Sequence, residues 1–154
     1  MTGSASSVIG TSDFAEDGVY NDAGKWTKCK FDHRPNEQAK FLAEKSAWNE
    51  LIVYLTDSPT KMVSILPYFI IGPPLYQEAF NSSCKAIKSI LTSEQYGFPE
   101  INMPCIDVRD LANLHVLMML HPSFGSHRRY LVGRESLWFS EIIDILKDNY
   151  DKIG

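Results

Sequence analysis

The chain has 154 residues, a length that suits one domain and allows a hydrophobic core to be buried. Hydrophobic residues make up 44% and charged residues 22%, which excludes a disordered chain and indicates ordinary globular composition. The net charge of −4 argues against binding to nucleic acid or an anionic membrane, and no apolar run is long enough to span a bilayer. We therefore expect a soluble, cytoplasmic protein with no nucleic-acid or membrane partner.

Residues 1–10 suit a short strand that ends at the Ser6–Ser7 pair. Residues 11–35 are rich in Gly, Asp, Lys and Asn and lack periodicity, which favours a long loop. Residues 36–55 predict a strong helix, whose start Pro35 restrains. Its apolar side chains recur on one stripe at helical spacing: Phe41, Trp48, Leu51, Ile52 and Leu55.

The rest of the chain alternates strands and helices. Residues 62–71 are apolar nearly throughout, which predicts one strand buried on both faces of a parallel sheet. The predicted elements after it are a helix over 76–92, a strand over 103–106, a helix over 107–120, a strand over 129–132 and a last helix capped by Ser136. This alternation predicts an α/β domain with a mainly parallel sheet.

The cysteines and histidines predict no metal site. The three cysteines are odd in number and widely spaced, without a Cys-x-x-Cys pair, which indicates free thiols in a reducing compartment. The four histidines show no ligand spacing with cysteines or carboxylates. We expect His115 to be a partly buried helix residue, and we expect the Arg128–Arg129 pair to form a solvated turn.

Asn36 and Lys40 stand four residues apart, so both side chains project from one face of the predicted helix. A Tyr in the first position would use the neighbouring ammonium to lower the pKa of its phenol and donate a proton near neutral pH. Asn cannot take this role, because a carboxamide does not titrate in that range. The pair therefore has the spacing of a proton-transfer site without its proton donor.

The segment from Asn36 to Trp48 resembles the active-site helix of the extended short-chain dehydrogenases/reductases, whose pattern is Tyr-x-x-x-Lys followed by Ala-Glu-Lys-x-x-Trp. The Ser6–Ser7 pair is similar to the strand end that delivers the catalytic Ser of that family. Four later segments resemble the family in the same order: Ser64–Pro74, Pro104–His115, Arg128–Val132 and Glu135–Glu141. The nearest branch is that of the dihydroflavonol reductases, cinnamoyl-CoA reductases and related carbonyl reductases, within the NAD-dependent epimerase/dehydratase type.

The resemblance implies roles for individual residues. Ser7 would hold the substrate carbonyl, and Lys40 would act in catalysis and bind the nicotinamide ribose of NADP or NAD. The backbone of the following strand would contact the nicotinamide at Pro67, Tyr68 and Ile70. Asn36 occupies the Tyr position, and the glycine-rich Gly-x-x-Gly-x-x-Gly turn that binds the pyrophosphate is absent from the sequence.

The implied fold is the C-terminal part of a Rossmann-type, mainly parallel sheet with flanking helices and a small substrate-binding lobe. Residues 1–154 would form a single partial domain. Within it, residues 1–73 would be the last part of the dinucleotide-binding fold with the active-site helix. Residues 74–154 would be mostly the substrate-binding lobe, with returning strands and helices.

Three functions remain open. The first is an NAD(P)-dependent oxidoreductase acting on a small-molecule carbonyl substrate, weak or inactive in this truncated chain because losing a general acid lowers the rate about a hundredfold to ten-thousandfold. The second is a non-catalytic pseudoenzyme or interaction module, whose open sheet edge predicts self-association or a covering partner. The third is a relative of the sugar-nucleotide epimerases or hydroxysteroid dehydrogenases. The chain would also suit a fragment of a longer gene product.

Overall fold

The computed structural model describes residues 1–9, 24–28, 34–54, 61–76, 81–92, 97, 100–121, 123–124, 128–134 and 136–150, without the side chains of 52–54 and 150. Most of the loop predicted over 11–35 lies outside these residues, as do Cys29 and Leu55. The chain divides into two compact units, which we describe separately. The first unit comprises residues 1–68 and 113–132, and the second comprises residues 69–112 and 133–154. The functional division expected at residue 73 stays a prediction.

The first unit is built on two parallel strands, β1 (Val63–Pro67) and β4 (Arg128–Val132), of which β4 confirms the strand predicted near its position. The pairing register places Ser64 opposite Arg129 and Leu66 opposite Leu131. Leu66 is fully buried, and it forms a core cluster with Val8, against which Leu131 packs. This core lies between the strand pair and the N-terminal segment.

The N-terminal segment forms less strand than the sequence predicts. Thr2 makes a single parallel bridge to Ile65, and the chain then turns into a 3₁₀ helix, η1 (Ala5–Ser7). Ser4 caps this turn, because its side-chain oxygen accepts a hydrogen bond from the backbone N–H of Ser6 at 3.3 Å. The prediction of a strand up to Ser7 was therefore wrong, since a local side-chain cap competes with strand pairing.

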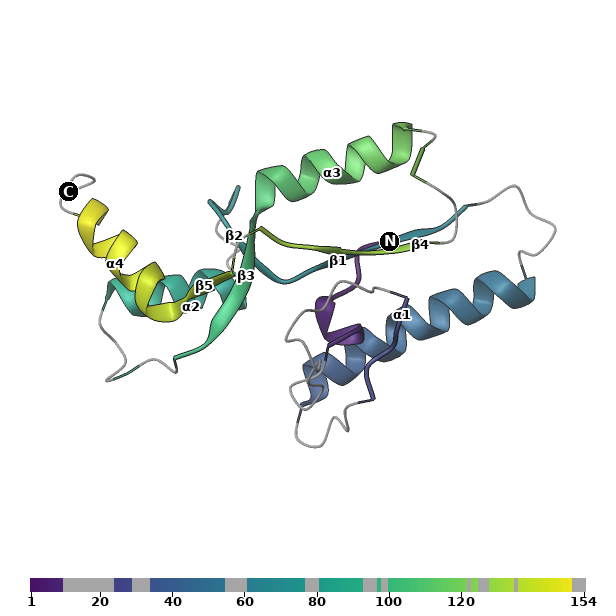
Figure 1. Ribbon diagram of the computed structural model, residues 1–154, viewed down its shortest axis with the longest axis horizontal. Helices are drawn as coiled ribbons and strands as arrows, with labels where there is room; N and C mark the ends of the chain where they lie inside the picture. Colours follow the sequence, from purple (N-terminus) through teal and green to yellow (C-terminus); the bar gives the residue numbers. More distant parts are fainter. Residues whose placement is uncertain are drawn as a thin grey trace. The chain divides into compact units, whose positions relative to one another are not determined.

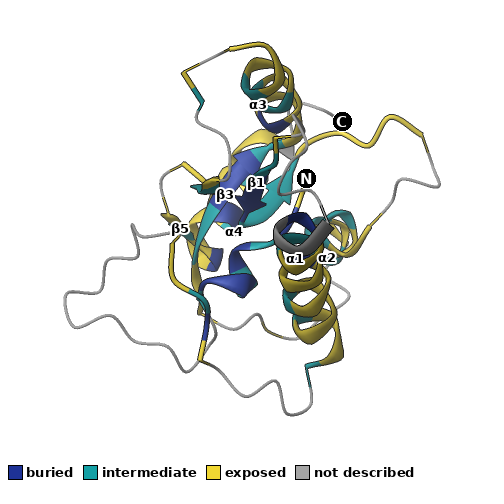
Figure 2. Cartoon of the chain, turned by 90° about the vertical axis from the view of Figure 1, so that its right-hand side faces the viewer, coloured by how far each residue is buried: buried dark blue, intermediate teal, exposed yellow. Residues whose placement is uncertain are grey.

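Helix α1 (Pro35–Tyr54) confirms the helix predicted over 36–55. Figure 1 shows α1 on one side of the β1–β4 pair and the later part of α3 (Val108–Leu120) on the other. Most of α1 is exposed, as the yellow of its ribbon in Figure 2 shows. Among the side chains of α1 that the structure describes, those of Glu44 and Leu51 are buried, so the centre of the predicted apolar stripe holds a carboxylate.

The second unit contains a three-stranded sheet in the order β2 (Phe69–Ile71), β3 (Asn102–Asp107) and β5 (Ser136–Trp138). β2 pairs with β3 in parallel and β5 pairs with β3 antiparallel. Helices α2 (Ser82–Leu91) and α4 (Phe139–Tyr150) contact each other and the sheet. The parallel pairs in both units and the alternation of strands with helices confirm the predicted α/β fold with a mainly parallel sheet.

Three predicted boundaries were wrong. The apolar run 62–71 is two strands in different sheets, because residues 63–67 pair with β4 whereas residues 69–71 pair with β3. The helix predicted over 76–92 begins at Ser82, where the Asn81 side chain accepts a hydrogen bond from the N–H of Cys84 at 3.1 Å. Ser136 is the first residue of β5 and does not cap α4.

The start of α4 uses the N–H of Trp138, which donates to the Glu141 carboxylate at 2.7 Å. This is one half of a capping box, in which an acidic side chain in the first turn satisfies a backbone donor. None of the helices in the described part of the chain is both long and apolar enough to cross a membrane.

Candidate functional site

Helix α1 presents the two residues that the sequence places at a proton-transfer site. Asn36 and Lys40 are both exposed and lie one helical turn apart on the same face. The helix begins at Pro35, whose fixed backbone angle suits a first helical position. Asn36 supplies an amide that donates and accepts hydrogen bonds but does not exchange a proton near neutral pH.

Ser7 ends η1 and is fully buried, in the part of the first unit that contacts α1. Its backbone carbonyl accepts a hydrogen bond from the N–H of Thr27 at 3.0 Å. Its hydroxyl oxygen has no hydrogen-bond partner among the described residues, and neither has that of Ser64 on β1. Both hydroxyls nevertheless lie near enough to the Glu44 carboxylate to lower its pKa. Ser7 is thus held beside Glu44.

The strand residues expected near the nicotinamide fall into both units. Pro67 ends β1 and is buried, and the N–H of Tyr68 donates to the carbonyl of Val132 at 3.2 Å, so the sheet uses that donor. Ile70 lies in β2 of the second unit, where it pairs with Ile106 of β3. The first unit therefore holds Ser7, Asn36, Lys40, Pro67 and Tyr68. The roles implied for these residues stay predictions.

A buried ion pair lies one turn after Lys40 on α1. The Glu44 carboxylate is fully buried and accepts two hydrogen bonds from the Arg129 guanidinium, Nε to Oε1 at 2.9 Å and Nη2 to Oε2 at 3.0 Å. The Arg129 side chain is only 7% exposed. Such a fork of two parallel hydrogen bonds is the strong geometry for a guanidinium and a carboxylate. It joins α1 to β4 within the first unit.

Further contacts surround both charges of the pair. Arg129 Nη1 donates to the carbonyl of Lys25 at 2.7 Å, and the guanidinium carbon lies 3.7 Å from the centre of the Trp26 ring. The indole N–H of Trp48 donates to Glu44 Oε1 at 3.3 Å. Burying two charges costs several kcal/mol unless hydrogen bonds compensate them, and these contacts supply part of that compensation.

The pKa of Glu44 is set by two opposing causes. Burial raises it, but hydrogen bonds and the positive charge from Arg129, with the hydroxyls of Ser7 and Ser64, outweigh burial and lower it below its ordinary value. Glu44 is therefore ionised at neutral pH.

The expectation that Arg128–Arg129 is a solvated turn was wrong for Arg129. In the sequence, the signal for this buried pair is Glu44, a charged residue on the apolar stripe of the predicted helix, which indicates a buried cationic partner.

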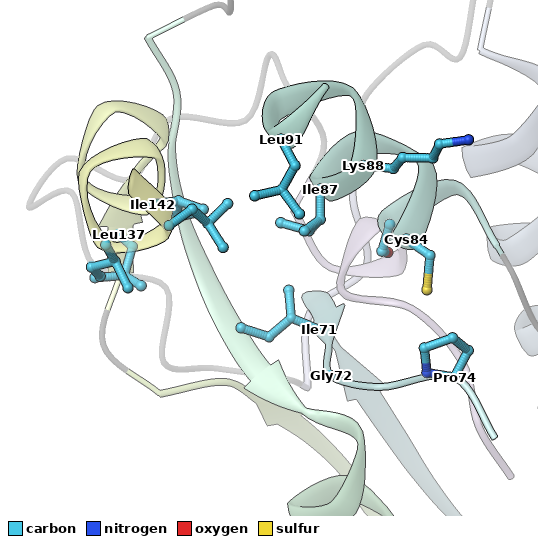
Figure 3. A pocket seen from close by; sticks show the side chains of 12 residues that line it. Ile71, Gly72, Pro74, Cys84, Ile87, Lys88, Leu91, Leu137 and Ile142 are labelled. Atoms are coloured by element: carbon cyan, nitrogen blue, oxygen red, sulfur yellow. The ribbon is translucent and has the colours of Figure 1, made fainter. Parts of the chain in front are cut away.

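The second unit contains an apolar pocket of about 540 Å³ between β2, α2 and α4. In Figure 3, Ile87 and Leu91 of α2 face Ile142 of α4, with Ile71 at the end of β2 beside them. Cys84 lies at one side near Pro74, and the Lys88 side chain extends away from the apolar interior. This volume falls in the range of small-molecule pockets. The pocket can enclose an apolar group with a cation at its rim.

Gly72, at the end of β2, also lines this pocket and has a φ of 124°. A side chain there would bring its Cβ within 2.9 Å of Val108 Cγ1 at the start of α3. At the same place Asp107 accepts hydrogen bonds from the Arg109 backbone N–H at 2.8 Å and from its guanidinium at 2.9 and 2.7 Å. Both the positive φ and the short distance to Val108 therefore require glycine at position 72.

No protein-family model matches the chain. The cinnamoyl-CoA reductase CAD2 of Medicago truncatula is 34% identical over 115 residues, which cover 75% of this chain and 33% of that protein. Cinnamoyl-CoA reductase 2 of Arabidopsis thaliana is 35% identical over 107 residues, which cover 70% of this chain and 30% of that protein. The chain belongs to the extended short-chain dehydrogenase/reductase family. It spans about a third of the length of these curated relatives.

A solved reductase structure has the same fold. The yeast methylglyoxal/isovaleraldehyde reductase Gre2 complexed with NADPH matches with a TM-score of 0.79 at 20% identity, covering 97% of this chain and 47% of that chain. The predicted Rossmann-type architecture is therefore confirmed.

Within the described residues of this family member, no three His, Cys, Asp or Glu side chains come together to hold a metal ion. His115 is half-buried, as expected, and its Nε2 lies 2.7 Å from Thr2 Oγ1.

Proposed function

We propose that the chain supplies the nicotinamide side and the substrate lobe of an NAD(P)-dependent carbonyl reductase. The observation that carries the proposal is the exposed Lys40 on α1, one turn before the buried Glu44 that pairs with Arg129. An ammonium on a helix that is anchored in this way suits hydrogen bonding to ribose hydroxyls. The names of the relatives support a carbonyl substrate, since they act on cinnamoyl-CoA and on methylglyoxal or isovaleraldehyde.

The residues of this chain fit only part of a dinucleotide. Lys40 suits the nicotinamide ribose, but the sequence has no glycine-rich turn for the pyrophosphate. The cofactor, when bound, supplies the hydride that reduces the carbonyl carbon. The resemblance assigns to Ser7 the hydrogen bond to the carbonyl oxygen, which its hydroxyl, fully buried beside Glu44, could donate only after local opening. The Lys40 ammonium would favour the negative charge that develops on that oxygen. Water would supply the proton in place of Asn36, which makes the reaction slow.

The apolar pocket bounded by β2, α2 and α4 suits an apolar small molecule, as the proposed substrate lobe requires. Its walls are aliphatic side chains, and Lys88 is a cation at the rim that suits an acidic group on the substrate. The cytoplasmic location expected from the sequence belongs to the same proposal, and it is supported by the free thiols of Cys84 and Cys105.

Calorimetric titration with NADPH and with NADH tests the proposal. We expect saturable binding that Lys40→Ala weakens about tenfold, because charge-assisted hydrogen bonds are lost. Lys85→Ala removes another exposed lysine, from α2, and is the matched control. If either cofactor binds, Asn36→Tyr should restore carbonyl reduction by about a hundredfold or more. Absence of binding at millimolar cofactor would contradict the enzyme proposal.

A second proposal is a non-catalytic interaction module of the same family. Asn36 favours it, and so do four exposed apolar residues on the later part of α3, which are 48–77% exposed: Val116, Leu117, Met119 and Leu120. Apolar patches of this kind mark association surfaces. We expect self-association in analytical ultracentrifugation that Leu117→Glu reduces, and a wild-type monomer would contradict this proposal. Binding of a nucleotide sugar without reductase activity would instead favour the epimerase alternative.

A further inference from the structure

The first unit contains a second pocket, of about 560 Å³, that the residues implied in catalysis do not line. It lies between α1, the start of β4 and the segment around Gly24, and we call it the aromatic–cation pocket. Three aromatic and three cationic side chains line it: Trp26, Trp48, Tyr130, Lys45, Arg128 and Arg129. All of these residues belong to the first unit.

The aromatic walls of the pocket are held in place by specific contacts. The Trp26 ring lies beneath the Arg129 guanidinium at 3.7 Å and meets the edge of Phe41 at 5.5 Å, with an angle of 88° between the rings. Trp48 is fixed by the hydrogen bond from its indole N–H to Glu44. Rigid aromatic side chains lose little entropy when a ligand stacks on them.

The charge of the pocket is positive. Arg129 is neutralised by Glu44, but Lys45 and Arg128 are exposed, and neither forms a salt bridge within the residues that the structure describes. The described lining of the pocket contains no Asp or Glu. Two uncompensated cations in a chain of net charge −4 favour an anionic ligand here.

The pocket is on a different side of α1 from the predicted cofactor ligand. Lys45 follows Lys40 by five residues, which rotates its side chain by about 140° around an α-helix. Lys40 and Asn36 do not line the pocket. Ligand binding here would therefore be separate from nicotinamide binding at Lys40.

We infer that the aromatic–cation pocket binds a small molecule in which a planar aromatic ring carries a negatively charged group. The ring would stack against Trp26 or Trp48. The anionic group would contact Lys45 and Arg128, whose ammonium and guanidinium donors suit both carboxylates and phosphates. This inference does not depend on the reductase proposal.

Tryptophan fluorescence tests this inference directly. The chain has three tryptophans, and Trp138 lies in β5 of the second unit. The Trp138→Phe chain therefore retains only the two pocket tryptophans as emitters. We expect benzoate and phenyl phosphate to change its emission saturably, and the tighter of the two identifies the preferred anionic group. Benzamide lacks the charge and cyclohexanecarboxylate lacks the aromatic ring, so both should bind at least about tenfold more weakly.

Two charge variants complete the test. Lys45→Gln and Arg128→Gln should each weaken benzoate or phenyl phosphate binding about tenfold, whereas Lys40→Gln should leave it unchanged. Both substituted residues are exposed, and circular dichroism establishes that the variants fold. The inference is overturned if neither aromatic anion binds up to its solubility limit. It is also overturned if cyclohexanecarboxylate binds equally well, or if Lys40→Gln weakens binding as much as Lys45→Gln.

Discussion

Glu44 and Arg129 are 85 residues apart in the sequence and form a buried ion pair with two hydrogen bonds, of 2.9 and 3.0 Å. Each partner would be an uncompensated buried charge without the other. The pair therefore holds α1 against β4 in the first unit. Because Lys40 lies one turn before Glu44 on the same helix, the pair also positions the predicted cofactor ligand.

Replacing Glu44 by Gln is expected to lower the free energy of unfolding of the first unit by about 3 kcal/mol, because the guanidinium stays buried without a counter-charge. Urea unfolding followed by circular dichroism measures this change. Glu50→Gln, at an exposed position of the same helix, should change the free energy by less than about 0.5 kcal/mol. Equal effects of the two substitutions would show that the pair adds no stability.

The ion pair should make the free energy of unfolding depend on pH in the acidic range. The folded-state pKa of Glu44 lies below its ordinary value of 4.5, since Arg129 and the two serine hydroxyls outweigh the effect of burial. The unfolded chain therefore binds the proton more readily than the folded chain. The stability that the ionised Glu44 contributes to the folded chain is complete above about pH 4.5. It is lost as the pH falls through the lower pKa of Glu44 in the folded chain. Urea midpoints should fall in this range for the wild-type chain, and less steeply for Glu44→Gln.

Gly72→Ala should destabilise the second unit. The φ of 124° is strained for any side chain, and the new Cβ would lie 2.9 Å from Val108 Cγ1. We expect a loss of about 1–3 kcal/mol in the free energy of unfolding. Gly97→Ala is the control, because no heavy atom of the described residues, chain neighbours aside, lies within 4 Å of the Cβ position there. A Gly72→Ala chain as stable as the control would mean that the backbone relaxes at little cost.

Asp107 should titrate at unusually low pH. Hydrogen bonds from the Arg109 side chain and backbone lower the pKa of Asp107 to about 2. Arg109→Gln removes the guanidinium, so the midpoint measured by carbon-detected NMR should rise toward the ordinary value of 3.8. Arg134→Gln, an exposed arginine of the same unit, should leave the midpoint in place. An unchanged midpoint in Arg109→Gln would contradict the assigned cause.

Elements with strong local patterns could be predicted from the sequence. The helical spacing of apolar residues indicated α1, and short β-branched or apolar runs indicated β3 and β4. The ordered motifs from Asn36 to Glu141 indicated the reductase family, which the comparisons confirm. The site residues were inferred from the same motifs, so Ser7, Lys40 and Pro67 remain predictions about role. Helices, strands and sequence motifs of this kind could be predicted because each depends on residues close together in the sequence.

Only the tertiary structure decided how distant segments pair. The run 62–71 divides after Pro67 into strands of two sheets, because its first part pairs with β4 and its last part with β3. The burial of Arg129 follows from the register that sets it opposite Ser64 and toward Glu44. Local periodicity carries no information on strand register or on a salt bridge between residues far apart in the chain. The sequence by itself therefore determined the α/β class and the family, and three-dimensional packing decided which charges are buried.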